Sequence, residues 1–356
     1  MTPGSDVFTR RYPAPDAGLL VAVKDNFDMA GEITGAGCRA VMESAAPAPA
    51  DAACLAGVRR AQASGTAQII GRTVMDELAA GATGINPWTG TPQNPRYPGR
   101  IPGGSSSGSA VAVATGSADI GFGTDTGGSV RIPAACCGIA GLKTSIGRVP
   151  TDGVHPLSQT LDVVGVMART SSDLAAGMAL LEPGFSIPAA GSRSVGRIRL
   201  SGNDRWIDAA VDDALAASGM VVRDVELDDW SAAHEATYTI LITEAWHNHQ
   251  HLLAAHPDGV SPLLTAQLVA GGRISSSEVG RAHRFRRYWI ARLNRLLEEV
   301  DLLCVPTLST APALLDDAET IDWGTFARTM PVNLAGSPRW PCRYPWSART
   351  SRHRYS

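Results

Sequence analysis

A chain of 356 residues, 44% hydrophobic and 18% charged, is long enough for one large domain or two of ordinary size. Its formal net charge of −3 gives no electrostatic reason to expect nucleic acid or an anionic membrane surface as a partner. The sequence has neither an apolar run of about 18 residues nor a secretory signal, so we expect a cytoplasmic protein without a membrane span.

The first part of the chain predicts strands that alternate with helices. A buried strand that ends in a polar turn is expected over residues 18–28, GLLVAVKDNFD. Helical spacing follows over residues 51–65, between an aspartate at the cap position and a closing glycine. A short strand is expected over 67–73, AQIIGRT, and another helix over 73–81, TVMDELAAG.

The middle of the chain begins with an irregular segment. Five prolines and no regular spacing indicate an ordered loop over residues 87–102. A buried helix of small residues is expected over 106–115, and a strand followed by a turn over 116–129. The second half adds expected helices over 208–218 and 276–300 and expected strands over 220–227 and 301–307. Alternation of this kind favours an α/β domain.

Residues 101–116, IPGGSSSGSAVAVATG, allow several interpretations. A flexible linker would be longer and would not lead directly into an apolar segment. Gly103 and Gly108 have the spacing of a phosphate loop, but the lysine that such a loop needs is replaced by Ser109. The pattern G-x-S-x-G places Ser106 at a nucleophile elbow. That motif requires a preceding strand, and none is predicted here, so it is the weaker alternative.

Three motifs taken in order resemble the amidase-signature family of serine hydrolases: VAVKDNFD, GGSSSGSA and GTDTGGSVRIPAACCGIAGLK. The resemblance runs from about residue 18 to about residue 182, with weaker support in DLLCVPT and MPVNLAGSP. It implies an α/β amidase-signature fold, in which helices cover both faces of a central mixed β-sheet. It also implies a single domain over residues 1–338, short at its N-terminus, that acts on a small-molecule amide without a metal or a cofactor.

The family's Ser–cis-Ser–Lys triad implies specific roles for three residues. Ser129 matches the nucleophile, Ser105 the bridging serine that relays the proton, and Lys24 the base. A neutral lysine can act as a base if burial lowers its pKa from about 10.4. Only two of the 31 basic residues are lysines, Lys24 and Lys143, and arginine cannot lose its proton in this way. Lys143 is expected to pack structurally.

The resemblance assigns the oxyanion hole to the backbone amides of Thr126, Gly127, Gly128 and Ser129. Two adjacent glycines allow the tight turn that would point successive N–H groups at one spot. An ordinary glycine turn at the end of a strand would be the preferred interpretation if the other two motifs were absent.

The resemblance also implies three supporting residues. Ser106 is expected to support the geometry of the bridging serine. Asp125 and Arg131 are expected to form a structural pair around the nucleophile loop. The alternative for Arg131 is that it faces a carboxylate on the substrate.

The segment EAWHNHQH raises the question of a metal site. Glu244, His247 and His251 fall on one helical face, and two histidines at this spacing can bind zinc. No third ligand has a recognisable context, and the six cysteines contain no C-x-x-C pair. We therefore expect no metal and interpret these side chains as polar helix residues.

Residues 339–356 depart from the family pattern. They contain five arginines, no acid and no helical or strand period, which predicts a disordered or out-of-frame tail. A basic tail that binds a partner is the alternative.

Together these features predict an amidohydrolase that cleaves a carboxamide C–N bond through an acyl-Ser129 intermediate and releases ammonia or an amine. The alternatives are a transamidase subunit of the amidotransferase A type, and a scaffold inactivated by its atypical C-terminus. A homodimer is a candidate assembly. The substrate itself, whether an aliphatic, aromatic or ureido amide, is left open.

Overall fold

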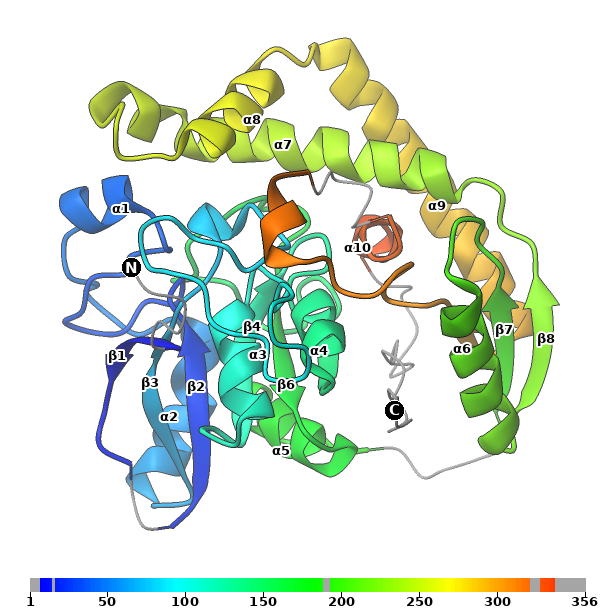
Figure 1. Cartoon of the computed structure of the whole chain (residues 1–356), viewed down its shortest axis with the longest axis horizontal. Coiled ribbons are helices and arrows are strands. Elements are labelled where there is room, and N and C mark those ends of the chain that lie inside the picture. The colour runs from blue at the N-terminus through cyan, green and yellow to red at the C-terminus, as the bar shows by residue number, and fades with distance from the viewer. Residues whose placement is uncertain (1–6, 15–16, 188–192, 321–326, 337–356) are drawn as a thin grey trace.

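A six-stranded mixed sheet lies at the centre of the first half of the protein (Figure 1). The computed structural model describes residues 7–14, 17–187, 193–320 and 327–336. Strand order in the sheet is β1-β3-β2-β4-β6-β5, with β2 parallel to β3 and β4 and the other pairs antiparallel. The strands are β1 (Phe8–Arg11), β2 (Leu19–Lys24), β3 (Ala67–Thr73), β4 (Ile120–Asp125), β5 (Ala140–Lys143) and β6 (Val163–Ala168).

Helices cover both faces of this sheet. Helices α2 (Ala56–Ala63) and α5 (Ser171–Leu181) pack on one face, and α3 (Ser107–Ala114) and α4 (Arg131–Cys137) pack on the other. Because strand side chains alternate between faces, Val21 joins the core beneath α2 and α5 while its neighbour Ala22 joins the core beneath α3. The predicted α/β fold with a central mixed sheet is confirmed.

The second half forms a three-stranded parallel sheet and a group of helices. Strand order there is β8-β7-β9. The sequence predicted two of these strands but not that they would form a separate sheet. The strands are β7 (Ser194–Ile198), β8 (Val221–Val225) and β9 (Leu302–Cys304), and the helices are α6 (Arg205–Ala217), α7 (Trp230–Ala255), α8 (Pro262–Gly272), α9 (Ser276–Glu299) and α10 (Met330–Ala335). None of the helices in the described part of the chain is long and apolar enough to cross a membrane.

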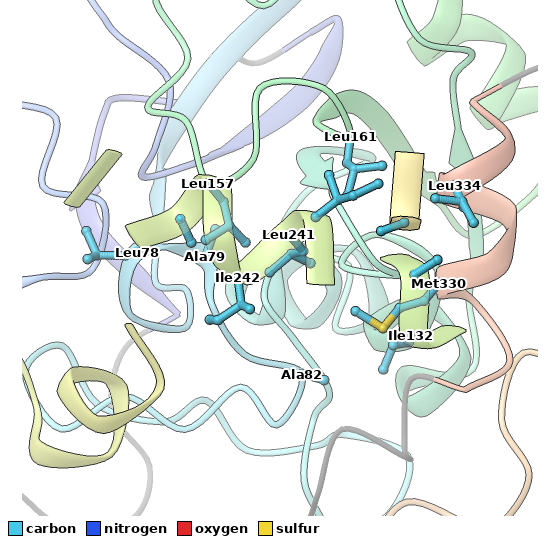
Figure 2. Close-up of a cluster of buried hydrophobic side chains, with 14 of the residues drawn as sticks. Leu78, Ala79, Ala82, Ile132, Leu157, Leu161, Leu241, Ile242, Met330 and Leu334 are labelled. Atoms are coloured by element: carbon cyan, nitrogen blue, oxygen red, sulfur yellow. The ribbon is translucent and has the colours of Figure 1, made fainter. Parts of the chain in front are cut away.

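A shared hydrophobic core joins the two halves (Figure 2). Leu241 of α7 and Met330 of α10 lie in the same buried cluster as Ile132 of α4 and Leu157 of the loop before β6. A Cβ atom on Gly127 would lie 3.2 Å from Met330 Cγ and 3.7 Å from Leu241 Cδ1. The apolar cluster therefore closes directly over the turn that follows β4.

The start of the helix predicted over 51–65 is wrong. Asp51 does not cap a helix, because its carboxylate binds the amide of Ala30 and the guanidinium of Arg59. A 3₁₀ turn over Ala53–Leu55 precedes α2 instead. The carboxylate oxygens of Asp51 are therefore bound to Ala30 and Arg59 and cannot accept from the first amides of a helix.

The helix predicted over 73–81 is also wrong, since only a 3₁₀ turn forms there, over Glu77–Ala79. Leu78 and Ala79 have positive φ angles of 49° and 60°, which are incompatible with a right-handed helix. The short helix α1 (Arg39–Ser44) was not predicted. The predicted tail over 339–356 lies outside the described residues.

Two glycines in helices are expected to respond in opposite ways to alanine. A Cβ on Gly57, in α2, would clash with the backbone carbonyl of Leu180 in α5. We expect Gly57→Ala to lower the free energy of unfolding by about 1–3 kcal/mol. The matched control is Gly280 in α9, where the nearest atom to a new Cβ is Arg284 Nη1 at 3.6 Å. Gly280→Ala should stabilise by about 0.5–1 kcal/mol. Urea unfolding measures both, and a stabilised Gly57→Ala would contradict the packing of α2 on α5.

Candidate active site

The topology of the central sheet brings the three sequence motifs to one edge. β2 and β4 are parallel neighbours, so Lys24 and Asp125 at their carboxyl ends lie at the same edge. Helix α3 packs against both strands, and the segment that leads into it carries Ser105. The turn after β4 carries Ser129 and leads into α4. Segments far apart in the sequence therefore converge on one place.

The amine of Lys24 lies between two hydroxyl groups. Its Nζ atom donates to Oγ of Ser105 and to Oγ1 of Thr124, each at 2.7 Å, and the side chain is fully buried. Burial lowers the pKa of Lys24 to about 7, although the carboxylates of Asp76, Asp162 and Asp125 oppose this shift. The amine therefore gives up its proton far more readily than an exposed lysine, and in its uncharged form it can accept a proton.

The serine-rich segment is hydrogen-bonded to the turn after β4. The Gly104–Ser105 peptide bond is cis. The amide of Ser106 donates to the carbonyl oxygen of Ser129 at 3.2 Å, and its hydroxyl donates to the carbonyl oxygen of Thr124 at 3.3 Å. Ser106 thus links the expected bridging serine to the expected nucleophile, while Ser129 itself is only 4% exposed.

The backbone of residues 126–129 is held from outside the turn. Gly128 has a φ angle of +143°, which residues with a side chain rarely adopt. The hydroxyl of Thr329 donates to the carbonyl oxygen of Gly127 at 2.5 Å. Within the part of the chain that the structure describes, the amides of Gly127, Gly128 and Ser129 donate to no protein acceptor.

The Thr126 side chain is held by a buried carboxylate that the sequence analysis did not identify. Its hydroxyl donates to Oδ1 of Asp162 at 2.5 Å. The other carboxylate oxygen accepts from the amides of Leu157 and Ser158 at 2.9 and 3.0 Å. Burial raises the pKa of Asp162 to about 6.

Asp125 and Arg131 form a buried ion pair that binds α10. The guanidinium donates twice to the carboxylate, at 2.8 and 2.9 Å, and also to the carbonyl oxygen of Thr329 and the side chain of Asn333. Burial alone would raise the pKa of Asp125, but Arg131 beside it holds this pKa well below its usual range. These contacts favour the structural interpretation of Arg131 over contact with a substrate carboxylate.

Further residues that the motifs did not single out complete the site. The amide nitrogen of Asn26 donates to Oγ1 of Thr124 at 3.1 Å, so this hydroxyl is fixed from two sides. Asn26 lies in VAVKDNFD and Thr124 in GTDTGGS, so both are polar residues at the carboxyl ends of the two strands that the motifs predict. Asp162 and Asn333 lie far from the three motifs in the sequence; Asn333 falls in the supporting segment MPVNLAGSP, but nothing there marked it as part of the site.

The remaining lysine and the histidine segment have structural contacts. Lys143 donates to the carbonyl oxygen of Thr144 at 2.8 Å, and burial lowers the pKa of its amine to about 8. Glu244 accepts from the hydroxyls of Ser158 and Thr160, so it binds the loop before β6. Among the described residues, no three His, Cys, Asp or Glu side chains gather as a metal site would.

Comparison with known proteins identifies the family. The family model described as Amidase matches residues 8–182 and 192–347. Amidase 1 of Oryza sativa subsp. japonica is 51% identical over 160 residues, which cover 45% of this chain and 36% of the rice protein. The A-type subunit of the glutamyl-tRNA(Gln) amidotransferase from Akkermansia muciniphila is 33% identical, over 91% of this chain and 78% of the relative.

A solved structure described as an amidase agrees with these sequence matches. It superimposes with a TM-score of 0.79 at 33% identity and covers 90% of this chain and 75% of that structure. The resemblance inferred from the three motifs is thereby confirmed. The chain belongs to the amidase-signature family, whose matched members include amidases and an amidotransferase subunit.

Proposed function

We propose that this protein hydrolyses a small carboxamide through an acyl-Ser129 intermediate and releases ammonia or an amine. The observation that carries the proposal is the 2.7 Å hydrogen bond between the buried amine of Lys24 and the hydroxyl of Ser105. A buried lysine with a lowered pKa, joined to a serine, is a base placed to activate a hydroxyl nucleophile. The chemistry needs neither a metal nor a cofactor.

The proposed reaction begins with two proton transfers. The hydroxyl of Ser129 attacks the amide carbonyl carbon and gives its proton to Ser105, whose own proton passes to Lys24. The tetrahedral intermediate then collapses, and the proton held by Lys24 returns through Ser105 to the departing nitrogen. A water molecule activated by the same pair hydrolyses the acyl ester and restores Ser129.

The turn after β4 supports the second part of the proposal. The tetrahedral intermediate carries a negative oxygen, which preorganised donors stabilise. The amides of Gly127, Gly128 and Ser129 have no protein acceptor within the described residues, and Thr126 is held in place by Asp162. We assign these four residues to the oxyanion hole, with Ser106, Asp125 and Arg131 as the residues that hold the turn.

A transamidase subunit is the second candidate, because the chain is similar to the A-type subunit of a glutamyl-tRNA(Gln) amidotransferase. Both candidates use the same proposed acyl-enzyme chemistry and differ in what surrounds it. A panel of aliphatic, aromatic and ureido amides distinguishes them: ammonia or amine release by the isolated chain supports the amidase. Release from free glutamine that requires amidotransferase partner chains supports the second candidate.

Replacement of the proposed nucleophile is expected to abolish covalent labelling. Ser129→Ala should remove labelling by a fluorophosphonate probe and reduce amide hydrolysis by at least about 10³-fold, since no hydroxyl remains to form the acyl ester. Ser106→Ala is the matched comparison, because it removes the hydroxyl at the centre of the G-x-S-x-G pattern; its labelling should persist. Labelling that persists in Ser129→Ala would show that the nucleophile lies elsewhere. An unreactive but folded wild-type protein would favour the inactive scaffold.

Arginine is not expected to replace Lys24 as the proposed base. Lys24→Ala should lower the rate of Ser129 labelling by about 10²–10⁴-fold, the usual contribution of a general base. Lys24→Arg should be equally slow, because arginine cannot release its proton to become a base. In the wild type, the labelling rate should rise with pH through about pH 7 as the amine loses its proton. Restored labelling in Lys24→Arg would contradict a neutral-amine mechanism.

A further inference from the structure

We propose that Asp76 is a positioning residue for the catalytic base: its buried carboxylate lies behind the segment that carries Ser105, the hydroxyl bound by Lys24, and places an uncontacted negative charge in the same buried site. The proposal rests on the function proposed above for Lys24 and Ser105. Asp76 lies outside the three motifs that carry the proposed triad.

The contacts of Asp76 place it directly behind the Gly104–Ser105 segment. Its backbone amide donates to the carbonyl oxygen of Ser105 at 3.1 Å. Its side chain occupies the space beside Gly104 where a Cβ atom would be, so that any larger residue at position 104 would clash with the carboxylate. The carboxylate therefore lies against the residue that precedes the hydroxyl bound by Lys24.

One oxygen of this carboxylate is fixed and the other is not. Oδ2 accepts from the amides of Thr83 and Gly84, each at 3.1 Å, which sets the orientation of the side chain. Oδ1 is buried and has no hydrogen-bond partner within the described residues. The charged form of a buried carboxylate without a bound cation is costly, so its stability depends on the charges nearby.

In its protonated form, Lys24 is a cation on which this carboxylate acts. Three buried carboxylates act on Lys24, those of Asp76, Asp162 and Asp125, and Asp76 has the largest effect of the three. Asp125 is already paired with Arg131. Asp162 is bound by a hydroxyl and two amides. Burial raises the pKa of Asp76 to about 6, while three backbone amides and Lys24 oppose the shift.

The sign of the effect follows from the charges. The negative charge of Asp76 favours the protonated form of Lys24 and raises its pKa, against the larger effect of burial. Without that charge, Lys24 would lose its proton at lower pH. The base would then be active under more acidic conditions but would be a weaker proton acceptor. Asp76 thus adjusts the base without contacting the substrate.

The test is the pH dependence of Ser129 labelling by a fluorophosphonate, which requires no knowledge of the substrate. In Asp76→Asn, the side-chain oxygen that binds Thr83 and Gly84 is retained and the charge is lost. We expect the acid limb of the labelling rate to move to lower pH by about one unit. A purely structural role would slow labelling at every pH and leave the limb where it is.

Glu77→Gln is the matched control. Glu77 is the neighbouring carboxylate and is also buried, but it binds the indole nitrogen of Trp88 and the amide of Ser261 and does not act on Lys24. Its acid limb should coincide with that of the wild type. A limb that stays in place in folded Asp76→Asn, or that moves equally in Glu77→Gln, would overturn the proposal.

Two further comparisons keep the outcomes distinct. Thermal melts followed by circular dichroism establish that each variant is folded, and Asp76→Ser, which keeps one oxygen acceptor in a smaller side chain, must move the limb in the same direction. If wild-type protein is labelled and only the shift is missing, Asp76 lacks the proposed role. If folded wild-type protein is not labelled at all, the proposed function itself fails, and this inference with it.

Discussion

The arrangement of the site depends on one buried amine without a bonded carboxylate. Lys24 lies at the end of β2, in the centre of the sheet. Among the described residues, its Nζ atom is hydrogen-bonded to the hydroxyls of Ser105 and Thr124 and to no carboxylate. A full charge there is poorly solvated, which is why burial dominates the pKa of this group. The hydroxyls of Ser105 and Thr124 stabilise whichever protonation state the amine adopts, because a hydroxyl can both donate and accept.

The turn that carries Ser129 is held by residues that follow it in the sequence by about two hundred positions. Arg131 joins Asp125 to Asn333, and Thr329 binds the carbonyl oxygen of Gly127. The apolar cluster around Met330 packs against the turn at Gly127. Preorganised amides need such rigid support, since donors that had to reorient during the reaction would stabilise its charge less.

Local pattern predicted the parts of the fold in which local and tertiary preferences agree. The strand over 67–73 and the helix near 106–115 were predicted well because apolar spacing and burial coincide there. Residues 73–81 form no α-helix, and the backbone amide of Asp76 donates to Ser105 instead of taking part in one. The residues of the motifs could be placed in the site by resemblance. Asp162 could not, because only folding brings it to Thr126.

The scarcity of lysine acquires a physical meaning in this structure. Buried arginines such as Arg72 and Arg131 each contact a carboxylate directly, at 2.5 and 2.8 Å. The two lysines are buried just as deeply, but they donate to hydroxyl or carbonyl oxygens, and burial lowers the pKa of both. Arginine suits a buried position where its permanent charge is paired, whereas an amine can remain where no partner charge is in contact by giving up its proton. Burial without a contacting counter-ion is what makes Lys24 suitable as a base. Lys143 is also buried, but among the described residues it donates to the backbone carbonyls of Thr144 and Gly336 and not to a hydroxyl.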